Sequence, residues 1–349
     1  MRQTLCYIPE TLFGCPLFGW GWGLALLLVT VFLSHIYQYV KHRKIKDIGS
    51  SLALIAIAGA MLVFVLPNLA VPEHGIPIRG YGFCLLVAIL SALGLVVHLA
   101  RRNNLSTEKV FSLCFWAVIS GILGARLFFV TEYWREMLRF DPAGNLLVSE
   151  SLFSFFNLAD GGLVVFGSIL GGILGALIFM LLNKMPILPT FDIMAPAVIL
   201  GSAIGRIGCL LNGCCFGGVS DLPWAIVFPP DSPAHVYQIM HGMLPPDSTE
   251  VLPVHPTQIY SSILALLLCG TLLFLGKLRF YQHRSGLVFA SYMILYSAGR
   301  FMLEILRTDE DSFFGTGLTV SQNVSILFGL TGIALFVYVC WKTHKERGT

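Results

Sequence analysis

Apolar residues occur along this chain in long, unbroken stretches. A membrane-spanning helix needs ~20 mostly apolar residues, whereas the strands of a membrane barrel alternate apolar and polar positions. Nine stretches have the helical pattern: 20–40, 51–70, 80–99, 111–131, 161–182, 191–211, 257–276, 286–306 and 322–341. The pattern therefore predicts an all-α polytopic membrane protein with about nine transmembrane helices.

Composition agrees with this prediction. Of the 349 residues, 56% are hydrophobic and 12% are charged, which is half the charged share of ~25% in soluble domains. A soluble globular domain and a disordered chain are both excluded. The net charge of +3 is accounted for by basic loops and gives no indication of nucleic-acid binding.

The basic residues set the expected orientation. Of the 22 Lys and Arg residues, 14 lie on alternate loops, after the odd-numbered stretches. Because cytoplasmic loops carry the excess of Lys and Arg, we expect the N-terminus outside and the C-terminus in the cytoplasm. The motif KHRKIK after the first stretch indicates a stop-transfer sequence rather than a cleaved signal peptide. Loop 212–256 has no Lys or Arg and is rich in Pro, which predicts a small non-helical cap on the outer side.

Three arginines, Arg126, Arg206 and Arg300, lie inside the predicted helices, each in the C-terminal half and so in the outer half of the bilayer. For a single such Arg, a structural role, either snorkelling or capping a neighbouring helix end, explains the position as well as a functional role does. Three at one depth favour a phosphate site, since guanidinium forms a bidentate fork for phosphate. Tyr296, Arg300 and Glu304 are spaced four residues apart and share one helix face. The inner halves of the helices are expected to carry no charge.

Segment 205–218 combines an Arg, an Asn, three Cys and five Gly residues. Zinc needs about four ligands, which Cys209, Cys214, Cys215 and His255 would have to supply. Adjacent cysteines are poor co-ligands, so we expect packing cysteines and no metal.

Five motifs in the chain resemble those of the bacterial prolipoprotein diacylglyceryl transferases, over about residues 78–341. The motifs are Arg79–Gly82, Gly124–Phe128, Gly205–Gly218, His255–Tyr260 and Tyr296–Glu304. The resemblance implies a seven-helix core at 76–349, which leaves 1–75 as an extension with two further helices.

This resemblance implies the transfer of a diacylglyceryl group from phosphatidylglycerol to the lipobox cysteine thiol of a prolipoprotein. The expected partners are phosphatidylglycerol, the signal peptides of prolipoproteins and membrane lipids, in the bacterial inner membrane and without a cofactor. The residues expected to act in catalysis are Arg206, Arg300, Glu304 and His255. Those expected to bind substrate are Tyr81, Arg126, Asn212, Gly217 and Tyr296.

Three positions depart from the family pattern. Phe166 stands where the family has a His, and Cys209 and Cys214 stand where it has Asn and Glu. Either Glu304 or His255 then serves as the base, or the chain is a diverged paralogue that uses another acceptor. A third hypothesis, from a different functional class, is a lipid or anion transporter, which would need ionisable residues along the whole membrane depth.

Overall fold

The computed structural model describes residues 4–9, 11–12, 15–17, 25–30, 59, 63, 75–135, 137–138, 147–156, 164–307 and 317–348. The chain forms two compact units. The first comprises Met1–Leu85, Gly208–Cys214 and Phe228–Val251, and the second comprises Leu86–Ile207, Cys215–Val227 and Leu252–Thr349. Two helices, α3 and α7, continue from one unit into the other.

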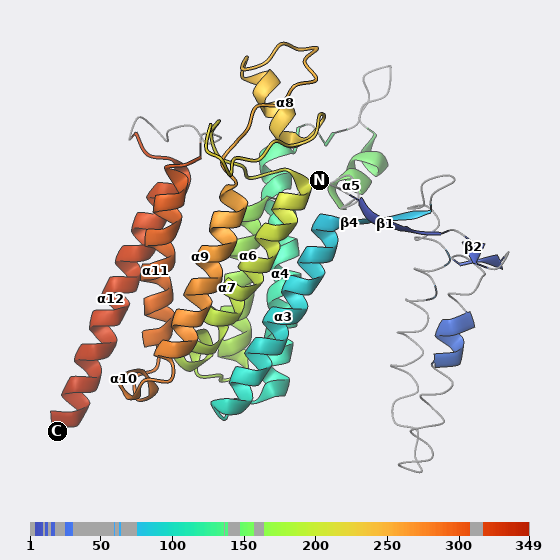
Figure 1. Cartoon of the computed structure of the whole chain (residues 1–349). Coiled ribbons are helices and arrows are strands. Elements are labelled where there is room, and N and C mark those ends of the chain that lie inside the picture. The colour runs from blue at the N-terminus through green and yellow to red at the C-terminus, as the bar shows by residue number, and fades with distance from the viewer. Residues whose placement is uncertain are drawn as a thin grey trace. The chain divides into compact units, whose positions relative to one another are not determined.

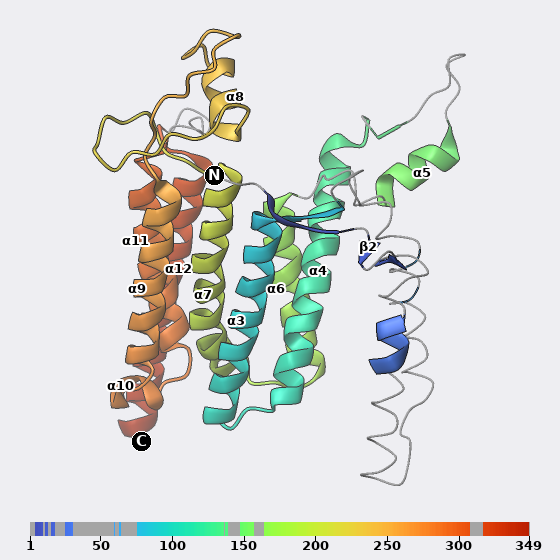
Figure 2. The same cartoon turned by 45° about the vertical axis from the view of Figure 1, so that its right-hand side comes forward.

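Long apolar helices make up the second unit, and Figures 1 and 2 show them running beside one another. The long helices are α3 (Gly80–Arg102), α4 (Thr107–Tyr133), α6 (Val165–Leu182), α7 (Ile187–Asn212), α9 (Thr257–Leu275), α11 (Leu287–Glu304) and α12 (Val320–Gly348). Two short helices, α5 (Val148–Phe156) and α10 (Arg279–Gln282), also belong to this unit. In the part of the chain that is described, five helices are long and apolar enough to cross a membrane: α3, α4, α7, α9 and α12. The predicted polytopic helical class is thereby confirmed.

Two more predicted stretches also form helices, α6 and α11, but each is only 18 residues long. Most of the predicted stretches 20–40 and 51–70 lies outside the described residues, so the predicted total of nine helices stays a prediction.

Short strands in the first unit depart from the expected all-α class. Strand β1 (Thr4–Ile8) pairs antiparallel with β4 (Ile76–Arg79), and β2 (Thr11–Leu12) pairs with β3 (Cys15–Pro16). Apolar windows of ~20 residues cannot detect pairs this short.

The Pro-rich loop is also not wholly non-helical, because it contains α8 (Pro233–Met240). The Ser232 side chain caps this helix by accepting from the His235 amide, and Pro233 stands at the first turn. There the fixed φ of proline favours a helix, since the missing N–H would have no helical partner.

Close packing of α4 against α6 depends on glycines. A Cβ at Gly167 would lie 2.5 Å from the Gly124 carbonyl oxygen and 2.6 Å from Phe128 Cβ. Such small residues allow two helices to approach within backbone contact in lipid.

Helix α7 contributes to both apolar cores of the second unit. With α3, α4 and α6 it buries Ile193 and Ala197, and with α9 and α11 it buries Ile199 and Ala203. Packing on both sides fixes the rotation of α7 about its axis. It thereby fixes the direction of the polar residues further along the helix, such as Ser202 and Arg206.

One charge contradicts the expectation that the inner halves of the helices carry none. Asp192 lies near the start of α7, where its carboxylate accepts from the amides of Gly286 (2.5 Å) and Phe289 (2.8 Å). It therefore caps the N-terminus of α11, where the helix dipole favours a negative charge. Asp192 is the second residue of the predicted stretch 191–211, so the expectation overlooked a charge that the sequence shows, and the fold adds the partners that hold it.

Candidate functional site

Two of the predicted arginines meet in one pocket of the second unit. This pocket, called the arginine pocket below, is lined by α7, α9 and α11. Its polar lining comes from Ser202 and Arg206 of α7, Ser261 of α9, and Tyr296 and Arg300 of α11. Leu264, Leu295 and Leu303 are among the apolar residues that complete it. Two arginines that line one small, largely apolar space offer the kind of side chain that binds an anion.

Arg300 is held in place from two sides. Its Nη2 lies 2.8 Å from Glu304 Oε2, and it donates to Ser321 Oγ of α12 at 2.9 Å. The Glu304 side chain is completely buried, and its other oxygen accepts from Thr319 Oγ1 at 3.4 Å. The i, i+4 spacing expected from the sequence thus produces a buried ion pair, so Glu304 orients Arg300.

The arginine pocket is narrow as it stands, with a volume of about 30 Å³. That volume is close to the ~30 Å³ that one water molecule occupies in the liquid. The neighbouring helices α9 and α11 are in close contact, since a Cβ at Gly299 would lie 2.6 Å from Leu264 Cδ2. A ligand larger than a water molecule therefore requires these walls to move apart.

Arg126, the third predicted arginine, has different partners. Its Nε donates to the Phe155 carbonyl at 2.9 Å and its Nη2 to the Ser154 carbonyl at 2.6 Å. The guanidinium also lies 5.2 Å from the ring centroid of Phe129. Arg126 thus caps the C-terminus of α5 and is not among the residues that line the arginine pocket.

His255 and Gly217 are joined by backbone hydrogen bonds just before α9. The Gly217 amide donates to the His255 carbonyl at 2.9 Å, and the Gly218 amide donates to the Leu306 carbonyl at 3.0 Å. A Cβ at Gly217 would lie 2.7 Å from the Leu306 carbonyl oxygen and 2.8 Å from His255 Cβ. Only glycine fits between these two segments, so Gly217 connects His255 to the end of α11.

The His255 ring has a buried nitrogen, Nδ1, that the fold leaves unpaired among the described residues. Its ring centroid lies 6.3 Å from that of Tyr260, whose hydroxyl accepts from Trp224 Nε1 at 2.7 Å. A buried ring nitrogen without a partner is costly, and it is what a proton acceptor for a bound substrate requires.

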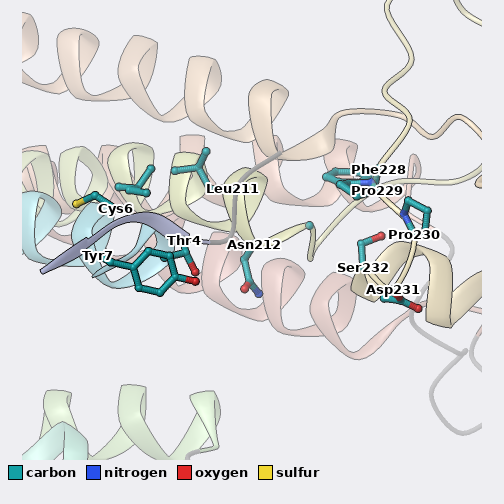
Figure 3. Close-up of a pocket in the computed structure, with 12 residues that line it drawn as sticks. Thr4, Cys6, Tyr7, Leu211, Asn212, Phe228, Pro229, Pro230, Asp231 and Ser232 are labelled. Carbon is teal, nitrogen blue, oxygen red and sulfur yellow. The ribbon is translucent and has the colours of Figure 1, made fainter. Parts of the chain in front are cut away.

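Tyr81 and Asn212 belong to the first unit. Tyr81 stands on the first turn of α3, where a Cβ at Gly208 would lie 3.3 Å from its ring. Asn212 ends α7 and lines a second pocket of about 640 Å³. In Figure 3 Thr4 and Tyr7 of β1 lie on one side of Asn212, and Asp231 and Ser232 lie on the other.

The structure also covers Phe166, Cys209 and Cys214, the three positions at which the sequence departs from the family pattern. Phe166, in the first turn of α6, is 48% exposed. The amides of Gly213 and Cys214 both donate to the Cys209 carbonyl, and Gly213 has φ +78°, so these residues form the left-handed end of α7. Cys214 Sγ lies 3.8 Å from the same carbonyl oxygen.

Sequence reasoning missed the hydroxyl groups of this site. Ser321 and Thr319 bind the Arg300–Glu304 pair, and Ser202 and Ser261 line the arginine pocket. Serine and threonine are common on membrane helices, so only the fold distinguishes these four.

Comparison with known proteins assigns the chain to a family. The model of the prolipoprotein diacylglyceryl transferase family matches residues 68–338. The chain belongs to this family. The sequence resemblance is therefore confirmed, and the strands β1 to β3 precede the matched region.

Members of the family show how far the similarity extends. A phosphatidylglycerol–prolipoprotein diacylglyceryl transferase of Rhodopirellula baltica is 37% identical over 70% of this chain, although the chain spans only half of that protein's length. A Clostridium perfringens protein of the same name, numbered 2, is 34% identical over 78% of this chain and 96% of its own length. One from Acaryochloris marina is 34% identical over 78% of this chain and 91% of its own.

Proposed function

We propose that this protein transfers the diacylglyceryl group of phosphatidylglycerol to the lipobox cysteine thiol of prolipoproteins. The observation that carries this proposal is the pair of arginines, Arg206 and Arg300, that line one pocket between α7, α9 and α11. The names of the related transferases support the choice of donor and acceptor.

The arginines bind the phosphodiester of the donor lipid. Negative charge grows on the phosphate as the glycerol phosphate departs, and two fixed guanidinium groups stabilise that charge in a site with little water. Tyr296 and the serines of the arginine pocket supply further hydrogen bonds to the headgroup. Glu304 and Ser321 keep Arg300 in its orientation through the contacts described above.

The reaction replaces one bond at the glyceryl carbon. The acceptor sulfur forms a C–S bond to the diacylglyceryl carbon, and the C–O bond to the phosphate breaks. Glycerol phosphate leaves with the electron pair of the broken bond. The thiol proton goes to His255, because its Nδ1 is buried without a partner whereas the Glu304 carboxylate is paired with Arg300.

The remaining expectations extend this proposal. Residues 76–349 form the transferase core, and residues 1–75 form an extension with two further helices. The protein lies in the bacterial inner membrane with its N-terminus outside and its C-terminus in the cytoplasm. There it takes phosphatidylglycerol from the outer leaflet and meets prolipoproteins through their signal peptides. Tyr81, Asn212, Gly217 and Arg126 contribute to binding substrate or to shaping its site.

Complementation tests the proposal. The gene is expressed in a bacterium depleted of its own transferase, and lipoprotein modification is followed by mass spectrometry. Growth and diacylglyceryl-modified lipoprotein are expected from the wild-type protein and not from Arg300→Gln. Unmodified prolipoprotein in cells that contain the wild-type protein in the membrane would refute the function. A changed lipid profile in those cells would point instead to transfer to another acceptor.

A further inference from the structure

The pocket around Asn212 has a strand as one wall. Four consecutive residues of β1, from Thr4 to Tyr7, line it. Side chains of a strand alternate between its two faces, so a pocket on one face would be lined by every second residue. Lining by four consecutive residues agrees with a pocket that runs along an edge of the strand, where backbone N–H and C=O groups point.

One of the two edges of β1 is hydrogen-bonded to another strand. The two-stranded sheet has the order β1–β4, so β4 covers one edge and β1 has no second neighbouring strand in the described part of the chain. Leu5 has no partner in the register with β4, because the pairing shifts between Thr4 and Cys6. An open strand edge is a template for pairing with another extended chain.

The opposite wall combines apolar residues, among them Phe228, Pro229 and Pro230, with polar ones. Asn212, Asp231 and Ser232 contribute an amide, a carboxylate and a hydroxyl group. Lys and Arg are absent from the described lining and from the sequence of the whole loop 212–256. An anionic phosphate finds no counter-charge here, whereas the amides of a polypeptide find both donors and acceptors.

We propose that the pocket beside β1 binds an extended segment of the acceptor polypeptide, which adds as a strand to the open edge of β1. Backbone hydrogen bonds to β1 give affinity, and Asn212, Asp231 and Ser232 contact the other side of the segment. This inference rests on the proposed function, since it names where the polypeptide substrate of that reaction docks. Because β1 precedes the region matched by the family, this docking edge is supplied by the N-terminal extension.

Cross-linking to a native thiol tests the proposal in the full-length protein. Cys6 is a free, exposed cysteine that lines the pocket. The probes are lipobox peptides in which the acceptor Cys is replaced by Ser and a single Cys is moved through the following six positions. Under mild oxidation, disulfides to Cys6 are expected at alternate positions and not with Cys6→Ser. The control variant Cys6→Ser with Met240→Cys moves the thiol to an exposed position outside the pocket lining and is expected to give no such alternation.

Competition identifies the occupant of the pocket. Excess unlabelled peptide is expected to suppress the cross-links, while phosphatidylglycerol vesicles are not. Suppression by the vesicles alone would overturn the inference in favour of a headgroup pocket. Equal cross-linking at all six positions, or none from a preparation that transfers lipid to the Cys-bearing peptide, would also overturn it. The transfer assay on the same preparation reports separately on the proposed function.

A kinetic variant provides an independent measurement. Leu5→Pro removes a backbone N–H at a position that does not pair with β4, and it is expected to raise the KM for peptide about fivefold. The KM for phosphatidylglycerol is expected to stay unchanged. Leu5→Ala keeps the N–H and is expected to raise the peptide KM less. Equal effects of the two variants, or a change only in the phosphatidylglycerol KM, would contradict docking along the strand edge.

Discussion

Glu304 Oε2 lies 2.8 Å from Arg300 Nη2, one helical turn apart on α11, and the carboxylate side chain is completely buried. A buried charge is stable only with its partner, so the pair acts as one unit. The carboxylate therefore neutralises the guanidinium of Arg300 and fixes its position.

Removing the charge of Glu304 is expected to destabilise the protein. Glu304→Gln leaves Arg300 without its counter-ion, which typically costs about 3 kcal/mol for a buried pair. A lower thermal unfolding temperature in detergent is the measurement. The double variant Arg300→Met with Glu304→Met is expected to recover much of the lost stability, because both charges are removed together. A Glu304→Gln protein as stable as the wild type would show that the pair is not structurally coupled.

Gly217→Ala is expected to disrupt the segment that carries His255. The new methyl group would lie 2.7 Å from the Leu306 carbonyl oxygen, which belongs to the backbone and cannot yield cheaply. We expect a loss of transfer activity of at least about tenfold, together with lower stability. Gly205→Ala is the matched control, since a Cβ there meets nothing within 4 Å. Full activity of Gly217→Ala would contradict the steric role of this glycine.

Arg126 is expected to stabilise the protein by holding the end of α5 in place. Arg126→Gln removes two hydrogen bonds to the carbonyls of Ser154 and Phe155, so stability falls by about 1–3 kcal/mol. The KM for phosphatidylglycerol is expected to change little, and this separates Arg126 from the arginines of the pocket. A large rise in that KM with unchanged stability would instead place Arg126 on the substrate.

The pH profile of a His255 variant tests proton transfer. Without this base, His255→Ala relies on thiolate that forms spontaneously, and a free cysteine has a pKa of about 8.5. Transfer by the variant is therefore expected to be weak at pH 7 and to rise steeply towards pH 9, whereas the wild-type rate changes less. Parallel pH profiles for the two proteins would exclude His255 as the base.

Local sequence pattern was sufficient for the helices and for one part of the site. Apolar length located α3, α4, α7, α9 and α12, and four-residue spacing placed Arg300 and Glu304 on one face of α11. These features depend on residues close in sequence, so periodicity reports them directly.

Features that join distant segments were not predictable in this way. Arg126 finds its acceptors 28 and 29 residues away on α5, and Asp192 caps a helix nearly 100 residues further along the chain. The pairing of β1 with β4 joins residues 4–8 to 76–79 across both predicted N-terminal helices. Such contacts depend on how distant segments pack together, and local spacing or periodicity does not report that packing.

A double-mutant cycle on Arg206 and Arg300 tests the central claim most directly. The quantity is kcat/KM for phosphatidylglycerol in wild type, Arg206→Gln, Arg300→Gln and the double variant. If both guanidinium groups bind one phosphate, each single change costs about 100-fold and the double variant loses far less than the product of the two. Two losses that multiply fully, or a single variant with wild-type activity, would contradict a shared phosphate site.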